Sequence, residues 1–290
     1  MSADPKTELI RGAHALTAPP PAQGSRGVTS DLTVDEALLL HASGWEPLDL
    51  VCGVGVVSVP SGTWSSPSSV WSWGSTTQLA SEACNAALDV ASQGLRDECV
   101  RVHGHGVVGV ELQVEVQPHH VEVDLVGTAV RPVSGEDPRG AVAARAVPFV
   151  SDLSARDLTL LLRAGWMPLD LAFGASFVYA PRRGAGAALR QSSQNIELSN
   201  YTEAMYAARE QAMERMQQLA LRAGAEGVVE VKVREGPMSF ARHAICFMAW
   251  GTAVRLVTAE HRSLRPEVVL PLDDAVVMFA AESLRGETQG

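Results

Sequence analysis

The sequence predicts an α+β protein made of two tandem domains. Each domain is a long helix packed on a small antiparallel sheet, preceded by a short helix and a strand. The first observation behind this prediction is a helical apolar period over residues 201–223 that stops at Gly224 and turns directly into a strand pattern. The second is that the same landmarks occur twice, since Trp45 to Trp166 and Gly106 to Gly227 are both separations of 121 positions. Self-similarity of this kind is typical of a tandem duplication.

A third landmark places the one length difference between the copies. The motif at residues 127–131, Gly-Thr-Ala-Val-Arg, returns at 251–255 after 124 positions, so the last hairpin of the second copy has a three-residue insertion. The predicted boundaries follow. They are a disordered N-terminal tail (1–28), a divergent first domain (29–131), a linker (132–149), a second domain (150–257) and a C-terminal extension (258–290).

In the first copy, a short helix is expected to begin at Ser30 or Thr33 and to stop at Gly44. A valine-rich strand follows over residues 48–59, and its internal glycines indicate a bulge or a close backbone approach. A long helix is expected over about 76–102, followed by a hairpin with alternate valines from Val108 to Val116 facing inward. The apolar stripe of this helix is Ala80, Cys84, Ala87, Ala91, Leu95 and Val102.

In the second copy, the short helix begins at Ser151 or Ser154, and the long helix begins near Tyr201 after a capping box of Asn200 and Glu203. Its stripe is Tyr201, Met205, Ala208, Ala212, Met216, Leu219 and Ala223. The strand after Gly224 is expected to turn Val229, Val231 and Val233 inward. Residues 271–278 resemble the entry to a third short helix, which we expect to dock where a following domain would sit.

Certain glycines are predicted to be structural because they recur in both copies or close a helix. They are Gly53, Gly106, Gly127, Gly174, Gly224, Gly227 and Gly251. The carboxylates Asp49 and Asp170 also recur, and we interpret them as strand-start residues that accept from backbone N–H groups rather than as an acid-base pair.

Composition narrows the class of protein. The chain has 290 residues, 46% of them hydrophobic, and a formal net charge of −10. That is enough apolar sequence for one core per domain, and the acidic balance disfavours nucleic acid and anionic membrane surfaces as partners. The four cysteines form no CxxC pair, no apolar run is long enough to span a bilayer, and no secretory signal is present, so we expect a cytoplasmic protein with reduced thiols.

Three groups of residues are candidates for function. Cys99, His103 and His105, at the end of the first long helix, have donor types that suit zinc or copper(I), although the alternative is a buried thiol beside solvent-facing histidines. A loop with three tryptophans could anchor a partner or stack on a flat ligand, unless they fold back beneath the loop. An apolar second face on the last strand predicts cover by another domain or subunit, with the short helix of the same repeat as the alternative. The loop residues are Trp64, Trp71 and Trp73. Those of the apolar face, which we expect to form an oligomer interface, are Cys246, Met248 and Trp250.

The second copy resembles the YbjQ-like family, which carries a heavy-metal-binding label. The resemblance rests on Asn195-Ile196, Tyr201, Ala208-Arg209, residues 224–229 and residues 251–254. It implies a fold similar to dodecin subunits, assembly into small rings that are typically pentameric, and a heavy-metal ion as the one cofactor to consider. It implies no catalytic residues, and the sequence has no nucleophile elbow, zinc-protease motif or phosphate-binding glycine loop.

The function predicted from the sequence is therefore that of a non-enzymatic, ring-forming homo-oligomer. It would act as a scaffold or binding module, with partner contacts through the tryptophan loop. One alternative is a metal-binding or metal-responsive protein. A second alternative is a carrier of a small ligand, for which the dodecin-like fold and the tryptophans suggest a flavin type.

Overall fold

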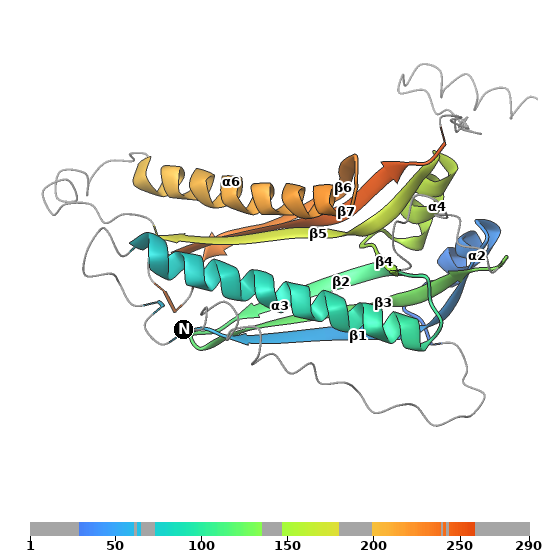
Figure 1. Cartoon of the computed structure of the whole chain (residues 1–290), viewed down its shortest axis with the longest axis horizontal. Coiled ribbons are helices and arrows are strands. Elements are labelled where there is room, and N and C mark those ends of the chain that lie inside the picture. The colour runs from blue at the N-terminus through green and yellow to red at the C-terminus, as the bar shows by residue number, and fades with distance from the viewer. Residues whose placement is uncertain are drawn as a thin grey trace, which may run out of the picture.

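A computed structural model describes residues 29–60, 63–64, 73–134, 147–179, 199–238, 240–241 and 244–258. The same order of elements occurs twice along these residues, which agrees with the predicted α+β class (Figure 1). The first repeat consists of α2 (Val34–Ala42), β1 (Trp45–Ser58), α3 (Trp73–Arg101), β2 (Gly106–Val116) and β3 (His120–Pro132). The second consists of β4 (Phe149–Val150), α4 (Ala155–Arg163), β5 (Trp166–Tyr179), α6 (Ser199–Arg222), β6 (Gly227–Pro237) and β7 (Ala244–Leu256).

The two sheets have matching topologies. The first has the strand order β1-β3-β2-β4 and the second β5-β7-β6, with antiparallel pairing throughout except for the parallel pair β2 and β4. The strand β4 belongs to the second repeat in sequence, yet it pairs with the first sheet, so the repeats interlock. The connections β2–β3 and β6–β7 span residues 117–119 and 238–243, which confirms the three-residue insertion.

Each long helix covers one face of its own sheet at very short range. A Cβ atom on Gly53 would lie 2.0 Å from the carbonyl oxygen of Ala91, and a Cβ on Gly174 would lie 2.0 Å from that of Ala212. The predicted close approach is thus confirmed, because strand glycines and helix alanines together let the backbones touch. Five positions of the predicted α3 stripe, from Ala80 to Leu95, are fully buried. Gly224, with φ +77°, ends α6 as expected.

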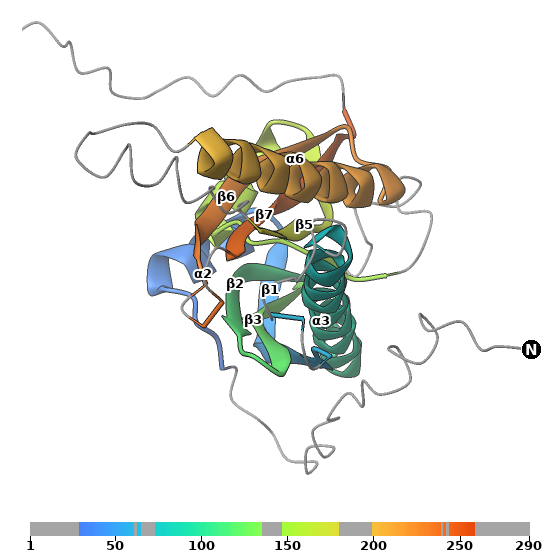
Figure 2. The same ribbon diagram turned by 90° about the vertical axis from the view of Figure 1, so that its left-hand side faces the viewer.

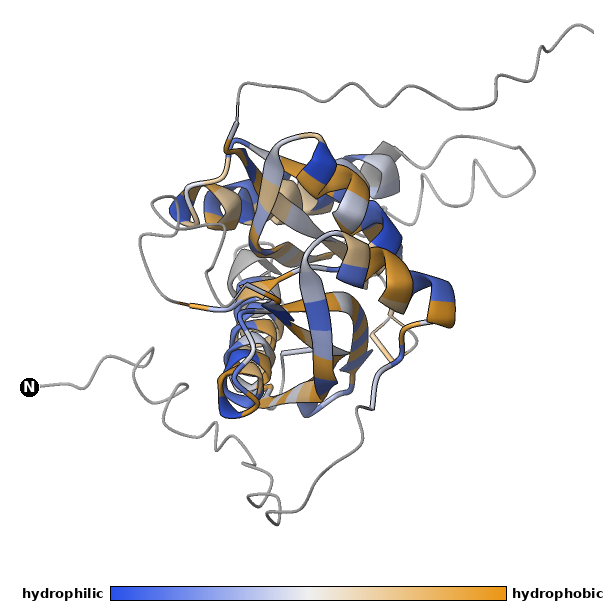
Figure 3. Ribbon diagram, turned by 90° about the vertical axis from the view of Figure 1, so that its right-hand side faces the viewer, coloured by the Kyte–Doolittle hydropathy of each residue, from blue (hydrophilic) through white to orange (hydrophobic). Residues whose placement is uncertain are grey.

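The two repeats are stacked, and α3 of the first repeat also packs against β5 of the second. Figure 1 shows α6 at the top, the second sheet below it, and then α3 in front of the first sheet. Turned by 90°, the structure shows α3 flanking β1 and β3 while lying under β5 (Figure 2). The short helices α2 and α4 lie together at one end, where hydrophobic and hydrophilic residues alternate along the ribbons (Figure 3). Among the described helices, none has the length and apolar character needed to cross a bilayer.

Two local predictions need correction. Helix α6 begins at Ser199 rather than near Tyr201, so Asn200 lies inside its first turn and is not the N-cap. The inward alternation of Val229, Val231 and Val233 is wrong, because a bulge interrupts β6 and leaves the last two 41% and 51% exposed. The same bulge in β2 moves Val107 into the main core beside Val110, while Val108 packs in the cluster around Phe149.

The short helices begin at the second of the two residues that the sequence left open in each case. Thr33 caps α2 in a capping box with Glu36, and Ser154 caps α4 by accepting from the backbone N–H of Asp157. The predicted N-terminal tail, most of the linker, and the proposed third short helix at 271–278 lie outside the described residues.

Candidate interaction site between the repeats

The second sheet buries both of its faces, and its second face lies on the first repeat. Along β5, Gly174 faces α6, while Phe173, Ala175 and Phe177 point the other way into the core of the first repeat. These three side chains are at most 4% exposed. A two-sided apolar strand of this kind requires cover on both faces, and α3 with β2 provides the second cover.

Polar side chains of α3 satisfy the backbone of β5, which is an edge strand. The amide of Asn85 donates to the carbonyl oxygen of Ala175 at 2.9 Å and accepts from its N–H at 3.0 Å. The hydroxyl of Ser81 accepts from the N–H of Phe177 at 2.9 Å. The helix therefore replaces the neighbouring strand that an edge would otherwise recruit.

An ion pair joins α3 and β5 at the other end of their contact. The guanidinium of Arg96 on α3 donates to the carboxylate of Asp170 on β5. Burial raises the pKa of the Asp170 carboxyl, and the charge of Arg96 opposes that rise. The same carboxylate accepts from the N–H of Leu171 at 2.9 Å, as Asp49 does from Leu50 at 3.0 Å, which confirms the predicted backbone acceptor role of both residues. They do not start their strands as predicted, because each lies at a bulge inside β1 or β5.

A Ser-Asp-Leu segment forms the second zone of contact. Beyond β4, the N–H of Ser151 donates to the carbonyl oxygen of Val107, and the Ser151 carbonyl accepts from Val110 N–H, both at 3.0 Å. Its neighbour Asp152 accepts from the hydroxyl of Thr252 at 2.6 Å, which fixes the segment to its own repeat. Lys232 lies 3.2 Å from the same carboxylate. The segment is thus held by the second repeat and presented to the first.

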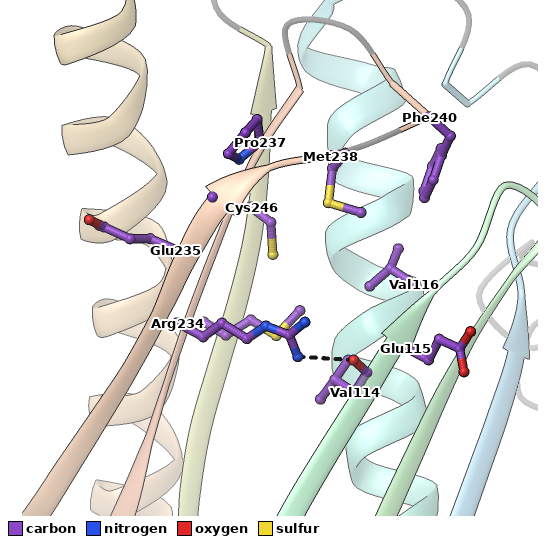
Figure 4. A pocket seen from close by; sticks show the side chains of 11 residues that line it. Val114, Glu115, Val116, Arg234, Glu235, Pro237, Met238, Phe240 and Cys246 are labelled. Carbon is purple, nitrogen blue, oxygen red and sulfur yellow. Dashed lines mark hydrogen bonds between the residues drawn. The ribbon is translucent and has the colours of Figure 1, made fainter.

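A cleft of about 330 Å³ opens between β2 and the end of the second sheet (Figure 4). Arg234 crosses it and donates to the carbonyl oxygen of Val114 at 3.1 Å. Cys246 lies on its floor, where burial raises the pKa of its thiol to about 12. A thiol with that pKa stays protonated near neutral pH and behaves as a small apolar side chain.

The predicted interface residues Cys246 and Met248 are therefore found at the contact between the repeats, where they are 7% and 4% exposed. Cover by another domain was the first of the alternatives that the sequence left open. Trp250 is half-buried at the rim of this contact. A contact of Trp250 with a second copy stays a prediction.

Of the three loop tryptophans, Trp64 packs against the second repeat. Its ring meets Phe177 and Phe240 edge to face, with centroids 5.5 Å and 5.2 Å apart. Trp71 lies outside the described residues. Trp73 is the first residue of α3, and its side chain is not among those described.

The metal candidates do not converge in the described part of the chain. Cys99 is fully buried, and its thiol donates to the carbonyl oxygen of Gly106 at 3.4 Å. His103 is exposed, with φ +60°, and His105 is half-buried in the turn before β2. No three His, Cys, Asp or Glu side chains among the described residues are placed to share a metal ion.

Sequence reasoning missed the polar face of α3. Ser81, Asn85 and Arg96 belong to a second helical stripe, beside the alanine stripe, and that stripe also includes Asp89 and Ser92. Asn85 and Ser92 are 7% and 3% exposed. Small polar residues recurring at helical spacing next to an apolar stripe were the signal that the helix has a second buried face.

The family model described as "Putative heavy-metal-binding" matches residues 183–257. An encapsulin nanocompartment protein of Mycobacterium tuberculosis is 35% identical over 255 residues, which are 86% of this chain and 93% of that protein. A UPF0145 protein of Halorubrum lacusprofundi is 40% identical over 77 residues, or 26% of this chain and 72% of the relative. Together with the repeated α+β architecture, these matches show that the chain belongs to the YbjQ-like family.

Proposed function

We propose that this protein is a non-enzymatic, cytoplasmic subunit of a homo-oligomeric ring that serves as a scaffold or binding module at a protein nanocompartment. The observation that carries the proposal is the match to the mycobacterial encapsulin nanocompartment protein, because it extends over nearly the whole of both chains. A relationship of that extent includes both repeats, so it concerns the two-repeat chain and not one shared domain.

The surface of the first repeat supports assembly independently. The outer face of β1 exposes Leu50, Val54 and Val56 by 40%, 40% and 47%. On β5 the matching positions are buried between the repeats. The aliphatic row is thus exposed to water on β1 and covered on β5. Such an exposed row is expected of a protein that associates through that face.

We further propose that the ring is pentameric, as the family resemblance implies, and that a protein partner binds through the tryptophan loop. Because Trp64 is used in packing, Trp71 and Trp73 are the residues proposed to contact that partner. The deciding experiment is the solution mass of the purified chain by light scattering, with metal analysis on the same peak. A mass near five chains supports the ring, and a monomer at all concentrations contradicts it.

A metal-binding role is the second candidate, because the matching family model carries that description. It would use Cys99 with His103 and His105, and it would require Cys99 to leave its hydrogen bond to the Gly106 carbonyl. Zinc or copper bound stoichiometrically and lost in Cys99→Ala would support it. Metal content that is substoichiometric, or unchanged in that variant, would contradict it.

A further inference from the structure

We propose that a second copy of this chain docks head to tail in the groove between α6 and β6, and that this contact repeats the one between the two repeats. The docking copy would contribute the outer face of its β1, its Ser30-Asp31-Leu32-Thr33 segment and its helix α2. The inference rests on the proposed homo-oligomer and specifies which surfaces meet. It follows from comparing equivalent positions of the two repeats, which are 121 residues apart. At several of them one residue is buried and its equivalent is exposed.

The docking face of the first repeat is the counterpart of a buried face. Leu50, Val54 and Val56 correspond to Leu171, Ala175 and Phe177 by the 121-residue offset. The exposed fractions of the first set are 40% or more, and those of the second are 4% or less. The outer face of β1 thus has the position and the apolar character of a face that is covered elsewhere in the same molecule.

The groove between α6 and β6 corresponds, in the first repeat, to the face of α3 and β2 that the second repeat covers. Between α6 and β6 lies an open, largely apolar pocket of about 440 Å³, whose lining includes Met213, Gln217 and Val231. Their counterparts on α3 and β2 are Ser92, Arg96 and Val110. Arg96 and Val110 bond to the second repeat, and Ser92 is 3% exposed on the same stripe of α3 as Arg96. Val110 is 4% exposed and Val231 is 41% exposed.

Tyr206 lies on the same stripe of α6 as Met213 and Gln217, two turns before the groove. It corresponds to Asn85, which is 7% exposed and holds both backbone groups of Ala175. Tyr206 is 60% exposed. In the proposed contact it lies against Val54 of the docking copy, where a large, rigid ring replaces the amide.

The edge of β6 retains the features that let β2 accept a strand. In β2, Gly106 leaves room for the ring of Phe149, which a Cβ would approach to 2.0 Å, whereas nothing lies within 4 Å of a Cβ on Gly227. The bulge residues Gly109 and Glu230 both have positive φ, +65° and +52°. In the described part of the chain, β6 has no strand on its outer side.

The segment proposed to occupy this edge is held ready on the first repeat. Ser30-Asp31-Leu32-Thr33 matches Ser151-Asp152-Leu153-Ser154 at the same offset. Asp31 accepts from the hydroxyl of Thr128, as Asp152 accepts from that of Thr252. Both segments are therefore fixed to their own repeat in the same way, and one of them already pairs with a bulged strand.

The short helices complete the match. In the contact between the repeats, the hydroxyl of Thr159 on α4 donates to the carbonyl oxygen of Leu39 on α2 at 3.4 Å. At the 121-residue offset, Thr159 corresponds to Leu38 and Leu39 corresponds to Leu160. In the proposed contact, Leu38 of the docking copy therefore lies on Leu160 of the first copy. These leucines are 64% and 40% exposed, and the contact would remove both from water.

The alternative occupant of the groove is the chain's own C-terminal segment at 271–278. It contains Pro271 and lacks the Ser-Asp-Leu order that both repeats share. At the same offset Leu272 replaces Ser151, so this segment lacks the hydroxyl that bonds to Thr252 and accepts from the N–H of Leu153. The sequence match therefore favours the second copy.

The experiment mixes two variants that are each defective at one end. Val54→Arg blocks the docking face and Tyr206→Arg blocks the face of α6 that receives it beside the groove. Each alone should raise the dissociation constant at least about 100-fold, because a buried unpaired charge is costly. Mixed one to one, they should form a dimer and no larger species, because each still has one intact surface. Light scattering gives the mass, and thermal unfolding shows that each variant is folded.

Gln218→Arg is the matched control. Gln218 lies on the same helix and is exposed, it is not among the residues that line the groove, and its counterpart Asp97 is exposed as well, so the control should assemble as the parent does. Parent-like assembly of Val54→Arg or Tyr206→Arg would overturn the proposed contact while leaving the homo-oligomer intact. A parent chain that is monomeric at every concentration would overturn both proposals.

A cross-link tests the same contact without disrupting it. In a Cys52→Ser background, Leu38→Cys with Leu160→Cys should give a ladder of intermolecular disulfides on oxidation. The single variants should give none. Assembly without a ladder would contradict the proposed register, and assembly that appears only after removal of residues 259–290 would identify the C-terminal segment as the occupant instead.

Discussion

Gly174 and Ala212 are placed so that a methyl group on the glycine would lie 2.0 Å from the alanine's carbonyl oxygen. No side-chain rotation can relieve such a clash, because both partners are backbone or Cβ atoms. The distance between α6 and its sheet is therefore set by the absence of one carbon atom. The same relation holds between Gly55 and Ala87 in the first repeat, again at 2.0 Å.

Gly174→Ala should accordingly destabilise the second repeat by about 3 kcal/mol or more, because the helix must move away from the sheet. The measurement is the free energy of unfolding by urea. Gly236→Ala is the matched control, since nothing lies within 4 Å of its added Cβ. Equal stabilities for the two variants would show that the helix can shift without loss.

Thr252→Val should cost about 1–3 kcal/mol, because it removes a buried hydroxyl that bonds to both Ser151 and Asp152 while keeping the shape of the side chain. Thr258→Val, at an exposed position, is the control. Thermal unfolding of the two variants gives the comparison. A midpoint for Thr252→Val equal to that of the control would contradict the role assigned to the Ser-Asp-Leu segment.

The Asp170 carboxyl should make the chain relatively more stable in mild acid. Burial raises its pKa in the folded state above the ordinary value of 3.8, so the folded state binds this proton more tightly than the unfolded state does. Its contribution to stability is fully present below the unfolded pKa and is lost as the pH rises through the folded pKa.

Asp170→Asn removes this titration and isolates it from that of Asp89, whose pKa burial also raises. The parent chain should therefore gain stability relative to the variant as the pH falls from 7 towards 4. Urea unfolding at several pH values measures the difference. A difference that stays constant, or that shrinks in acid, would contradict the assignment.

The thiol of Cys52 should react first with a thiol reagent, because it is exposed whereas Cys84, Cys99 and Cys246 are buried. Its rate at pH 8 should nevertheless be below that of a free cysteine, since burial and the nearby Glu98 raise its pKa. Because Cys52 lies on the proposed docking face, the rate should fall further as the protein concentration rises. A rate independent of concentration, in a protein that does assemble, would place the contact elsewhere.

Much of each repeat could be predicted from local sequence. The alanine stripe of α3, a short helix that starts at Thr33, and the close approach of Gly53 and Gly174 to their helices each express short-range geometry, and the structure confirms them. The bulge at Glu230 could not be predicted, because a positive φ at a non-glycine residue leaves no mark in an alternating valine pattern. This bulge changes which valines of β6 face α6.

The arrangement of the two repeats could be predicted from the sequence only in part. An apolar face at Cys246 and Met248 indicates that something covers it, but not what, since many surfaces of similar hydrophobicity satisfy that need. The specific answer depends on Asn85 and Arg96, whose partners are 90 and 74 residues away in the chain. Long-range pairs of this kind carry no periodicity, so only a comparison of helix faces between the repeats could have suggested them.

The joining of two repeats in one chain affects how their contact responds to dilution. The contact between α3 and β5 forms between segments of the same molecule, so its effective concentration does not fall when the protein is diluted. Any contact between copies must instead be sustained by the amount of protein present. Half of the contacts in such an assembly would thus be permanent and half reversible, so dilution would divide it at chain boundaries into two-repeat units and leave no single repeat with an uncovered second sheet.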